Sequence, residues 1–292
     1  MGVEQVILGR KRDLGGFTVR RVLPAASARM IGPFIFFDHL GPLLLEPGEG
    51  LDVRPHPHIA LATVTYLFAG SIMHRDSLGN VQEIRPGDVN WMTAGRGIVH
   101  SERSPEKERE RGVRAHGIQS WVALPDGHEE VEPDFQHHPA ASLPSASFDG
   151  IDLRVIAGEA FGRRSPTRVL CPTLYVDLLV AEGARLEIGA DYAEQALYVA
   201  EGEIEVSGVR GREGELLVLV SGDAVTLHGR RSARVILLGG ERFTTPRFIW
   251  WNFVASNRER IEIAKRDWAQ GRFARVPGEH EFIPLPPDSP TE

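Results

Sequence analysis

The sequence contains little cysteine and no long apolar run, and each absence excludes a class of protein. Cys171 is the single cysteine among 292 residues, so no internal disulfide can form, and we expect a buried structural thiol. No apolar run approaches the roughly 20 residues that a membrane-spanning helix needs. The opening stretch MGVEQVILGRKRD is too polar for a secretory signal. We therefore expect a cytoplasmic protein without a membrane partner.

Basic charge is also in deficit. The sequence has 33 Lys and Arg against 40 Asp and Glu, which gives a formal net charge of −7. A protein that binds nucleic acid must neutralise phosphates with a basic surface. The charge balance therefore argues against direct nucleic-acid binding.

Short strand-like segments separated by turn residues fill most of the sequence. Examples are ATVTYLFAGSIMHRD, GDVNWMTAG, QALYVAEGEIEVSG and GELLVLVSGDAVTLHG. Runs at spacings of roughly 8–12 residues are typical of β-sandwiches and barrels. Residues 76–80 (DSLGN) predict a hairpin tip, and residues 85–88 (RPGD) predict a turn into the next strand. The predicted fold class is all-β, built from antiparallel barrels.

One segment has a strong helical pattern. Residues 256–271 (SNRERIEIAKRDWAQG) offer Ser256 or Asn257 as an N-cap and Gly271 as a stop. One stripe of this helix should pack on the body of the protein, and it carries Ile261, Ala264, Lys265 and Trp268.

Two other segments are less regular. Residues 147–162 (SFDGIDLRVIAGEAFG) fit a helix or a strand equally well. The charged run at residues 104–112 (SPEKERERG) is interpreted as a solvated loop.

The sequence repeats itself. Residues 65–72 (TYLFAGSI) align without gaps with residues 197–204 (LYVAEGEI), which matches Tyr66 to Tyr198 and Gly70 to Gly202; PGDVNWM likewise matches EGELLVL further on. This repeat predicts two barrel halves. We place them at 1–135 and 136–292, with the junction in the proline-containing stretch EPDFQHHPAASLPSASFDG and a monomer as the default oligomeric state.

Two pairs of polar residues carry the candidate chemistry. His56 and His58 lie two apart in RPHPHIALATVTYLF, and His100 and Glu102 have the same spacing in AGRGIVHSERS. Because side chains alternate along a strand, the members of each pair point the same way. If the two strands are neighbours, three imidazoles and one carboxylate converge. Such a set suits a divalent transition metal.

A purely structural interpretation of these residues stays open. The two histidines could cap a barrel mouth, and Glu102 could pair with Arg103 or Arg96. The metal itself is also open, because imidazole suits Fe, Zn, Cu or Ni, whereas a carboxylate favours Fe(II) or Mn.

The second half of the repeat lacks these ligands. His56 and His58 align with Ile188 and Ala190, and His100 aligns with Leu227. Glu102 aligns with a glycine, and His228 is one residue out of register and would point to the other face. We expect no metal in this half.

The sequence resembles the pirin family of two-domain cupins along nearly its whole length. The resemblance is carried by IGPFIFFDHLGP, RPHPHIALATVTYLF, HRDSLGN, VNWMTAGRGIVHSER, IWWNFVASNRERIEIAKRDW and VPGEHEFIPLP. It implies an iron-type metal in the N-terminal cupin, held by three histidines and one glutamate. The matching positions here are His56, His58, His100 and Glu102. Many pirins carry a further glutamate where this sequence has Ala62, so Glu102 would be the only carboxylate at the metal, as ligand, base or both.

The resemblance implies quercetin 2,3-dioxygenase activity as the first hypothesis. One divalent metal per chain, Fe(II) before Zn, Mn, Ni or Cu, would act with O2 on a flavonol or a similar small aromatic enol. Glu102 would be the catalytic base. The apolar run LATVTYLF together with Asn90, Trp91 and Met92 could form the substrate pocket or simply barrel core.

Two other functions remain open. Pirins also resemble regulatory proteins, so the chain could be an iron-dependent, redox-responsive partner of a transcription factor or metabolic enzyme. A zinc-bound or metal-free structural protein would keep the fold without either mechanism. His74 and His116 could lie near the pocket mouth or behind the ligands, and neither is assigned.

Overall fold

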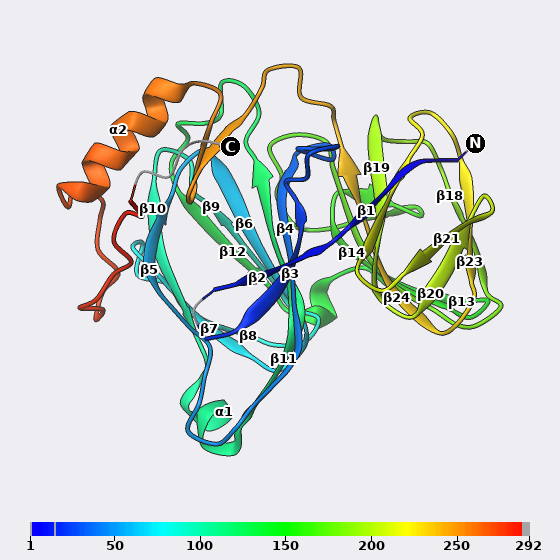
Figure 1. Cartoon of the computed structure of the whole chain (residues 1–292), viewed down its shortest axis with the longest axis horizontal. Coiled ribbons are helices and arrows are strands. Elements are labelled where there is room, and N and C mark those ends of the chain that lie inside the picture. Colours follow the sequence, from blue (N-terminus) through cyan, green and yellow to red (C-terminus); the bar gives the residue numbers. More distant parts are fainter. Residues whose placement is uncertain (1, 15, 288–292) are drawn as a thin grey trace. The chain divides into compact units, whose positions relative to one another are not determined.

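The computed structural model describes residues 2–14 and 16–287, and it confirms the all-β class (Figure 1). Within these ranges, α-helix is confined to α1 (Glu106–Arg111) and α2 (Arg258–Ala269). Neither helix is long and apolar enough to cross a membrane. Cys171 is buried, as predicted.

The chain forms two compact units that each take both a central segment and one end of the sequence. The C-terminal barrel comprises Met1–His39 and His138–Phe243, and the N-terminal barrel comprises Leu40–His137 and Thr244–Glu292. These units differ from the predicted ranges 1–135 and 136–292 at both ends of the chain. The reason is non-local pairing, because the hydrogen bonds that hold β1 (Val3–Leu8) come from β22 (Glu215–Leu219).

The stretch expected to be a linker is also structured. It contains β12 (Asp134–His138), the 3-10 turn η1 (Ala140–Ser142) and β13 (Ser145–Phe148). The predicted boundary at residue 135 therefore cuts through β12, which pairs with β9 in the N-terminal barrel.

Two sheets enclose the core of the C-terminal barrel, in the orders β1-β22-β19-β24-β17-β14-β13 and β18-β23-β20-β21. Their inward side chains form one apolar cluster that includes Ile188, Leu217 and Leu227. The strands of this unit whose bounds are not yet given are β14 (Ile151–Ala157), β15 (Glu159–Ala160), β16 (Arg163–Arg164), β17 (Thr173–Val180), β18 (Arg185–Ile188), β19 (Glu194–Glu201), β20 (Glu203–Val206), β21 (Val209–Arg212), β23 (Val225–Gly229) and β24 (Ala233–Gly240). The same unit includes the residues of β2 (Arg10–Asp13) and β3 (Thr18–Leu23), which belong to the sheet of β4.

The strands of the N-terminal barrel belong to two sheets, in the orders β12-β9-β6-β11-β4-β3-β2 and β5-β10-β7-β8. The chain passes from one unit to the other within β4 (Phe34–Leu45). The other strands are β5 (Asp52–His58), β6 (Leu61–Ala69), β7 (Ile72–Asp76), β8 (Val81–Ile84), β9 (Val89–Thr93), β10 (Ile98–Arg103), β11 (Val113–Ala123), β25 (Phe248–Trp250) and β26 (Phe253–Ala255).

The glycines matched by the repeat occupy equivalent turns. Gly70 has φ +79° and Gly202 has φ +80°, a region that favours glycine. A Cβ atom would lie 2.2 Å from the carbonyl oxygen of Arg114 at Gly70 and 2.1 Å from that of Ser232 at Gly202. The preceding Tyr66 and Tyr198 are fully buried. The repeat therefore reflects the same local structure in each barrel.

Local turn and cap predictions agree with the structure. β7 and β8 form the predicted hairpin, in which the Asp76 carboxylate accepts hydrogen bonds from the backbone N–H groups of Leu78 and Asn80. In α2, Asn257 is the N-cap and accepts from the N–H of Glu259. Residues 147–162 form strands and not a helix, in β13, β14 and β15 with turns between them.

The run 104–112 is partly helical instead of a loop. Glu106 and Glu108 lie in the first turn of α1 and Arg109 and Arg111 in the last, which complements the helix dipole. Arg109 also donates to both oxygens of Asp52.

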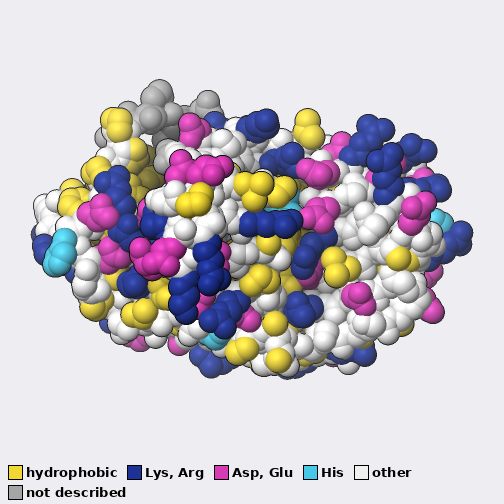
Figure 2. All heavy atoms as spheres, turned by 90° about the horizontal axis from the view of Figure 1, so that it is seen from below, with side chains coloured by type: hydrophobic (Ala, Val, Ile, Leu, Met, Phe, Trp, Pro, Cys, Tyr) yellow, Lys and Arg dark blue, Asp and Glu magenta, His cyan; other side chains and the backbone are white. Residues whose placement is uncertain are grey.

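On the face that Figure 2 shows, acidic and basic side chains are intermingled and form no continuous basic patch.

Candidate metal centre

Strand pairing brings the first two histidines opposite the third. In the antiparallel pair β5–β10, His100 lies directly opposite His56, and Ile98 lies opposite His58. The next pair along joins Glu102 to Val53, so β5 contains one extra residue at this point. Such a bulge on an edge strand tolerates a proline, because the missing N–H group is not needed for the ladder. Pro55, the first of the two prolines in RPHPH, thus fits the local backbone.

The three imidazoles form a compact buried cluster. The ring centroids of His56 and His100 lie 4.4 Å apart, those of His56 and His58 4.9 Å, and those of His58 and His100 5.1 Å. One ring nitrogen from each lies within 4.8 Å of the others, a spacing that one ion could bridge. The sequence prediction that these three side chains converge is confirmed.

The hydrogen bonds of His56 and His58 use Nδ1 and leave the lone pair of Nε2 available to bind a metal. His56 Nδ1 donates to the carbonyl oxygen of Arg54 at 2.8 Å, and His58 Nδ1 donates to that of Asn252 at 3.0 Å. A proton on Nδ1 leaves the lone pair on Nε2 free. His100 Nε2 is buried and has no hydrogen-bond partner among the described residues. A bound metal ion would satisfy this nitrogen, so the donor set fits a metal.

Burial also keeps these imidazoles in the neutral form that ligates metals. It lowers the pKa of His56 to about 4, and it lowers the pKa of His58 and His100 well below the usual histidine value. The neighbouring imidazoles lower the pKa of His58 and His100 further. All three are therefore neutral at pH 7 without a metal.

Glu102 lies at the edge of this cluster. Thr65 on β6 donates its hydroxyl hydrogen to Glu102 Oε1 at 2.9 Å, and burial raises the pKa of the carboxyl group. Glu102 forms a second potential metal group with His100 and His74, whereas His56 and His58 share only His100 with that group. The four predicted residues thus lie in two overlapping groups. Glu102 as the fourth ligand stays a prediction.

His74, which the sequence analysis left unassigned, lies beside His100 and Glu102. Its Nδ1 lies 3.5 Å from His100 Nδ1, its Nε2 lies 3.2 Å from an oxygen of Asp76, and its ring stacks on Phe135 at 4.5 Å. Burial alone would raise the pKa of Asp76, but hydrogen bonds from His74 and Asn80 hold it below the usual range. The pattern HRD, with alternate buried positions on β7, was the signal for this pair.

Other residues singled out from the sequence line the barrel or lie elsewhere. Asn90 lies opposite Thr65, and its side-chain oxygen accepts from His137 Nδ1 at 2.7 Å. Met92 packs in a buried apolar cluster with Ala94 and Ile98. His116 packs edge-on against Phe68 and belongs to neither potential metal group.

The C-terminal barrel has apolar residues where the ligands would lie. Leu227 and Ile188 are buried in its core, while His228 lies on the other, more exposed face of β23, opposite Arg185 and Glu205. The register of His228 is therefore as predicted.

Comparison with known proteins identifies the family. A model described as Pirin matches residues 16–122, and a model of the pirin C-terminal cupin domain matches residues 175–274. The chain belongs to the pirin family. A pirin-like protein of Caulobacter vibrioides is 49% identical over 288 residues, which cover 97% of this chain and 99% of that protein.

Solved structures agree with this assignment. The crystal structure of quercetin 2,3-dioxygenase from Acinetobacter baumannii superposes with a TM-score of 0.91 at 36% identity, covering 99% of this pirin and 96% of that chain. A bacterial pirin from Escherichia coli, solved in complex with nickel(II), has a TM-score of 0.64 at 17% identity and covers 81% of this chain and 98% of its own. At that identity the second likeness shows the fold alone. The molecule is thus a bicupin, as expected.

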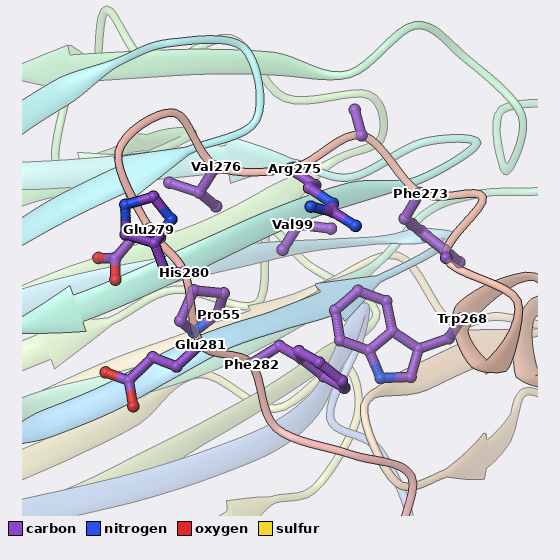
Figure 3. Close-up of a pocket in the computed structure, with 12 residues that line it drawn as sticks. Pro55, Val99, Trp268, Phe273, Arg275, Val276, Glu279, His280, Glu281 and Phe282 are labelled. Carbon is purple, nitrogen blue, oxygen red and sulfur yellow. The ribbon is translucent and has the colours of Figure 1, made fainter.

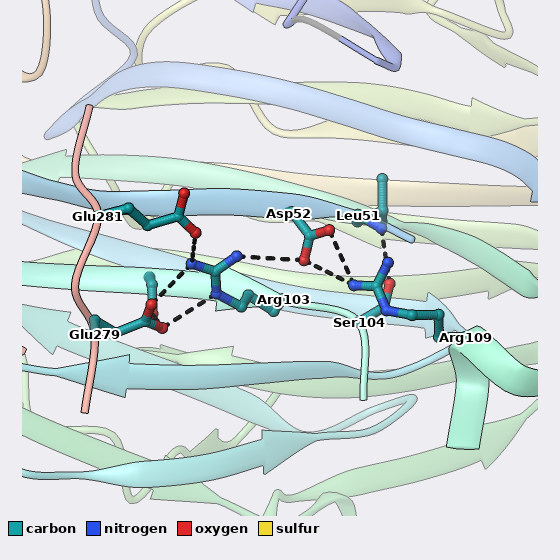
Figure 4. Close-up of polar contacts among 8 residues, drawn as sticks. Leu51, Asp52, Arg103, Ser104, Arg109, Glu279 and Glu281 are labelled. Carbon is teal, nitrogen blue, oxygen red and sulfur yellow. Dashed lines mark hydrogen bonds and ion pairs between the residues drawn. The ribbon is translucent and has the colours of Figure 1, made fainter. Parts of the chain in front are cut away.

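The C-terminal tail braces the strand that carries His100 and Glu102. Glu279 accepts from two nitrogens of Arg103 (Figure 4). It also accepts from Ser101 Oγ at 2.9 Å, and Ser101 and Arg103 flank Glu102 in sequence. Arg103 also contacts Glu281 and Asp52. These hydrogen bonds hold the pKa of Glu279 below its usual range.

Replacing Glu279 with glutamine should loosen the tail. An amide keeps the hydrogen bond to Ser101 but loses the charge that binds Arg103, at a cost of about 1 kcal/mol for this partly exposed pair. Because the folded pKa of Glu279 is lowered, its contribution is complete above the unfolded pKa and is lost as pH falls through the folded value. Hydrogen exchange over residues 273–283 should therefore be faster in Glu279→Gln at pH 7. The wild type should approach the variant only in acid, and equal exchange at pH 7 would refute this bracing role.

Proposed function

We propose that this pirin is a metal-dependent dioxygenase that cleaves the ring of a flavonol or a similar aromatic enol. The observation that carries the proposal is the buried cluster of His56, His58 and His100, whose ring nitrogens converge, together with the carboxylate of Glu102, which lies in a second group that shares His100. The structural likeness to a quercetin 2,3-dioxygenase supports the substrate class.

His56, His58 and His100 would hold the metal through neutral imidazoles, with Glu102 as the fourth ligand. We favour Fe(II), although the E. coli pirin was solved with nickel(II). A bound divalent metal would make the substrate hydroxyl more acidic, and Fe(II) would add the redox chemistry that O2 requires.

Glu102 would accept the proton of the substrate hydroxyl at a carboxylate oxygen. Without a bound metal, burial raises the pKa of this group above that of an exposed glutamate. Thr65 occupies Oε1 with a hydrogen bond, so Oε2 is the oxygen left to serve the metal and the substrate proton in turn. Thr65 thereby orients the carboxylate.

The barrel interior would bind the aromatic part of the substrate. Trp121 packs edge-on against His58 at 5.1 Å, and Met92 is buried, so the surroundings of the imidazoles are largely apolar. Asn90 adds one polar group, since its buried side-chain nitrogen has no hydrogen-bond partner among the described residues. This amide could donate to a substrate oxygen. An apolar lining with few directed polar groups is typical of small-molecule sites.

Metal analysis followed by oxygen uptake tests the proposal. Protein purified without a His-tag should contain about one iron per chain and should consume O2 only when quercetin is present. One iron without uptake would contradict dioxygenase activity and favour a redox-responsive binding protein. Zinc alone would exclude both roles, because zinc has no redox chemistry.

A further inference from the structure

Apart from the imidazole cluster, a pocket lies on the outside of the N-terminal barrel, under the C-terminal tail (Figure 3). Its lining includes Pro55, Val99, Trp268, Phe273, Arg275 and Phe282. Val99 precedes His100 on β10, and alternation directs the two side chains to opposite faces of the strand. The pocket is therefore separate from the imidazole cluster.

Aromatic side chains form one side of this pocket. The Trp268 ring meets Phe273 edge-on at 5.8 Å and Phe282 edge-on at 5.7 Å. Trp268 Nε1 donates to the carbonyl oxygen of Ile283 at 3.0 Å, which fixes the indole. Phe282 is 56% exposed, which is unusual for a side chain that serves only the core. Such walls favour a flat aromatic ligand.

The volume of the pocket suits a single ring. The cavity measures about 160 Å³. An apolar cavity of about 150 Å³ admits benzene, whereas sites for drug-sized ligands measure about 300–1,000 Å³. A flavonol, with its two ring systems, exceeds this volume.

One cation of the lining, Arg275, is available to a ligand. Arg275 is exposed and forms no ion pair or hydrogen bond with another described residue. The two carboxylates of the lining, Glu279 and Glu281, are both bound by Arg103, at 2.8 and 2.6 Å. A free guanidinium beside an aromatic wall can bind a carboxylate through two parallel hydrogen bonds.

We propose that this pocket binds a small single-ring aromatic carboxylate. The ring lies against Trp268, Phe273 and Phe282, and the carboxylate lies on Arg275. Because the pocket is on the outer face of β10, its ligand does not compete for the position of the substrate beside the histidines.

Fluorine NMR of metal-loaded, full-length protein with 4-fluorobenzoate as the probe tests this site. We expect saturable binding that weakens about fivefold in Arg275→Gln, the size of a solvent-accessible ion pair. Arg272→Gln is the matched control, since Arg272 is exposed, pairs with Asp267 and does not line the pocket. The uncharged probe 4-fluorobenzamide should bind more weakly than the acid to the wild type and equally to both variants.

A second variant tests the aromatic wall. Phe282→Ala removes an exposed side chain, so the barrel should fold, and it should weaken binding of both the acid and the amide. Unchanged affinity for 4-fluorobenzoate in Arg275→Gln would overturn the proposal. Binding that survives in this variant but disappears when the metal is chelated would place the probe on the metal instead. None of these results depends on turnover, so they do not bear on the dioxygenase.

Discussion

Replacing His58 with alanine should remove most of the bound metal from this pirin. His58 supplies one of three converging imidazoles, and the two that remain would hold the ion with at most Glu102. Loss of an outer-shell partner already weakens metal sites by roughly 10–100-fold, so loss of a ligand should cost at least about 100-fold. The measurement is metal content by elemental analysis after dialysis against metal-free buffer.

Two controls separate a lost ligand from a damaged fold. His228→Ala removes an imidazole from the exposed face of β23 in the C-terminal barrel and should leave the metal content unchanged. His58 packs against Trp121, so alanine leaves a cavity there, and His58→Gln keeps more of the volume. In both His58 variants the C-terminal barrel, which has its own core, should unfold as in the wild type. Full metal retention in both would refute the site.

Strands such as β23 could be predicted because they bury one of their two faces in the core of a barrel. In β23 the pattern VTLHG alternates buried and partly exposed residues, and that alternation is visible in the sequence as period 2. The division of the chain could not be predicted, because β1 is held by β22 more than 200 residues later. Hydrogen bonds between distant backbones leave no local pattern. The short helix α1 was missed because it buries no residue and so shows no apolar stripe.

The histidines were predictable for the same reason, since a spacing of two puts side chains on one face. The residues that form hydrogen bonds with His58 and Glu102 could not be predicted. Thr65 reaches Glu102 from the opposite sheet, and the carbonyl that fixes His58 belongs to Asn252, 194 residues away. Which residues of two sheets face each other depends on how the sheets pack, and spacing within one strand does not contain that information. The extra residue in β5 likewise has no signal beyond its proline.

Replacing Glu102 with glutamine should separate metal binding from proton transfer. The amide oxygen can still accept the hydrogen bond from Thr65, and the amide has nearly the same volume, so the barrel should fold. The three histidines should keep part of the metal. An amide cannot take up the substrate proton, and loss of a general base typically costs about 10²–10⁴-fold in rate. Oxygen uptake with quercetin, normalised to bound metal, should therefore fall within that range.

Thr65→Val is the matched control for this variant. It removes the hydroxyl that holds Glu102 Oε1 but leaves the carboxylate able to accept a proton. We expect Thr65→Val to keep most of the turnover per bound metal, while Glu102→Gln loses it. If both variants lose activity equally, turnover depends on the orientation of the Glu102 side chain and not on its basicity. If Glu102→Gln turns over normally, the base is another group, and His74, which lies beside His100 and Glu102, becomes the first residue to replace.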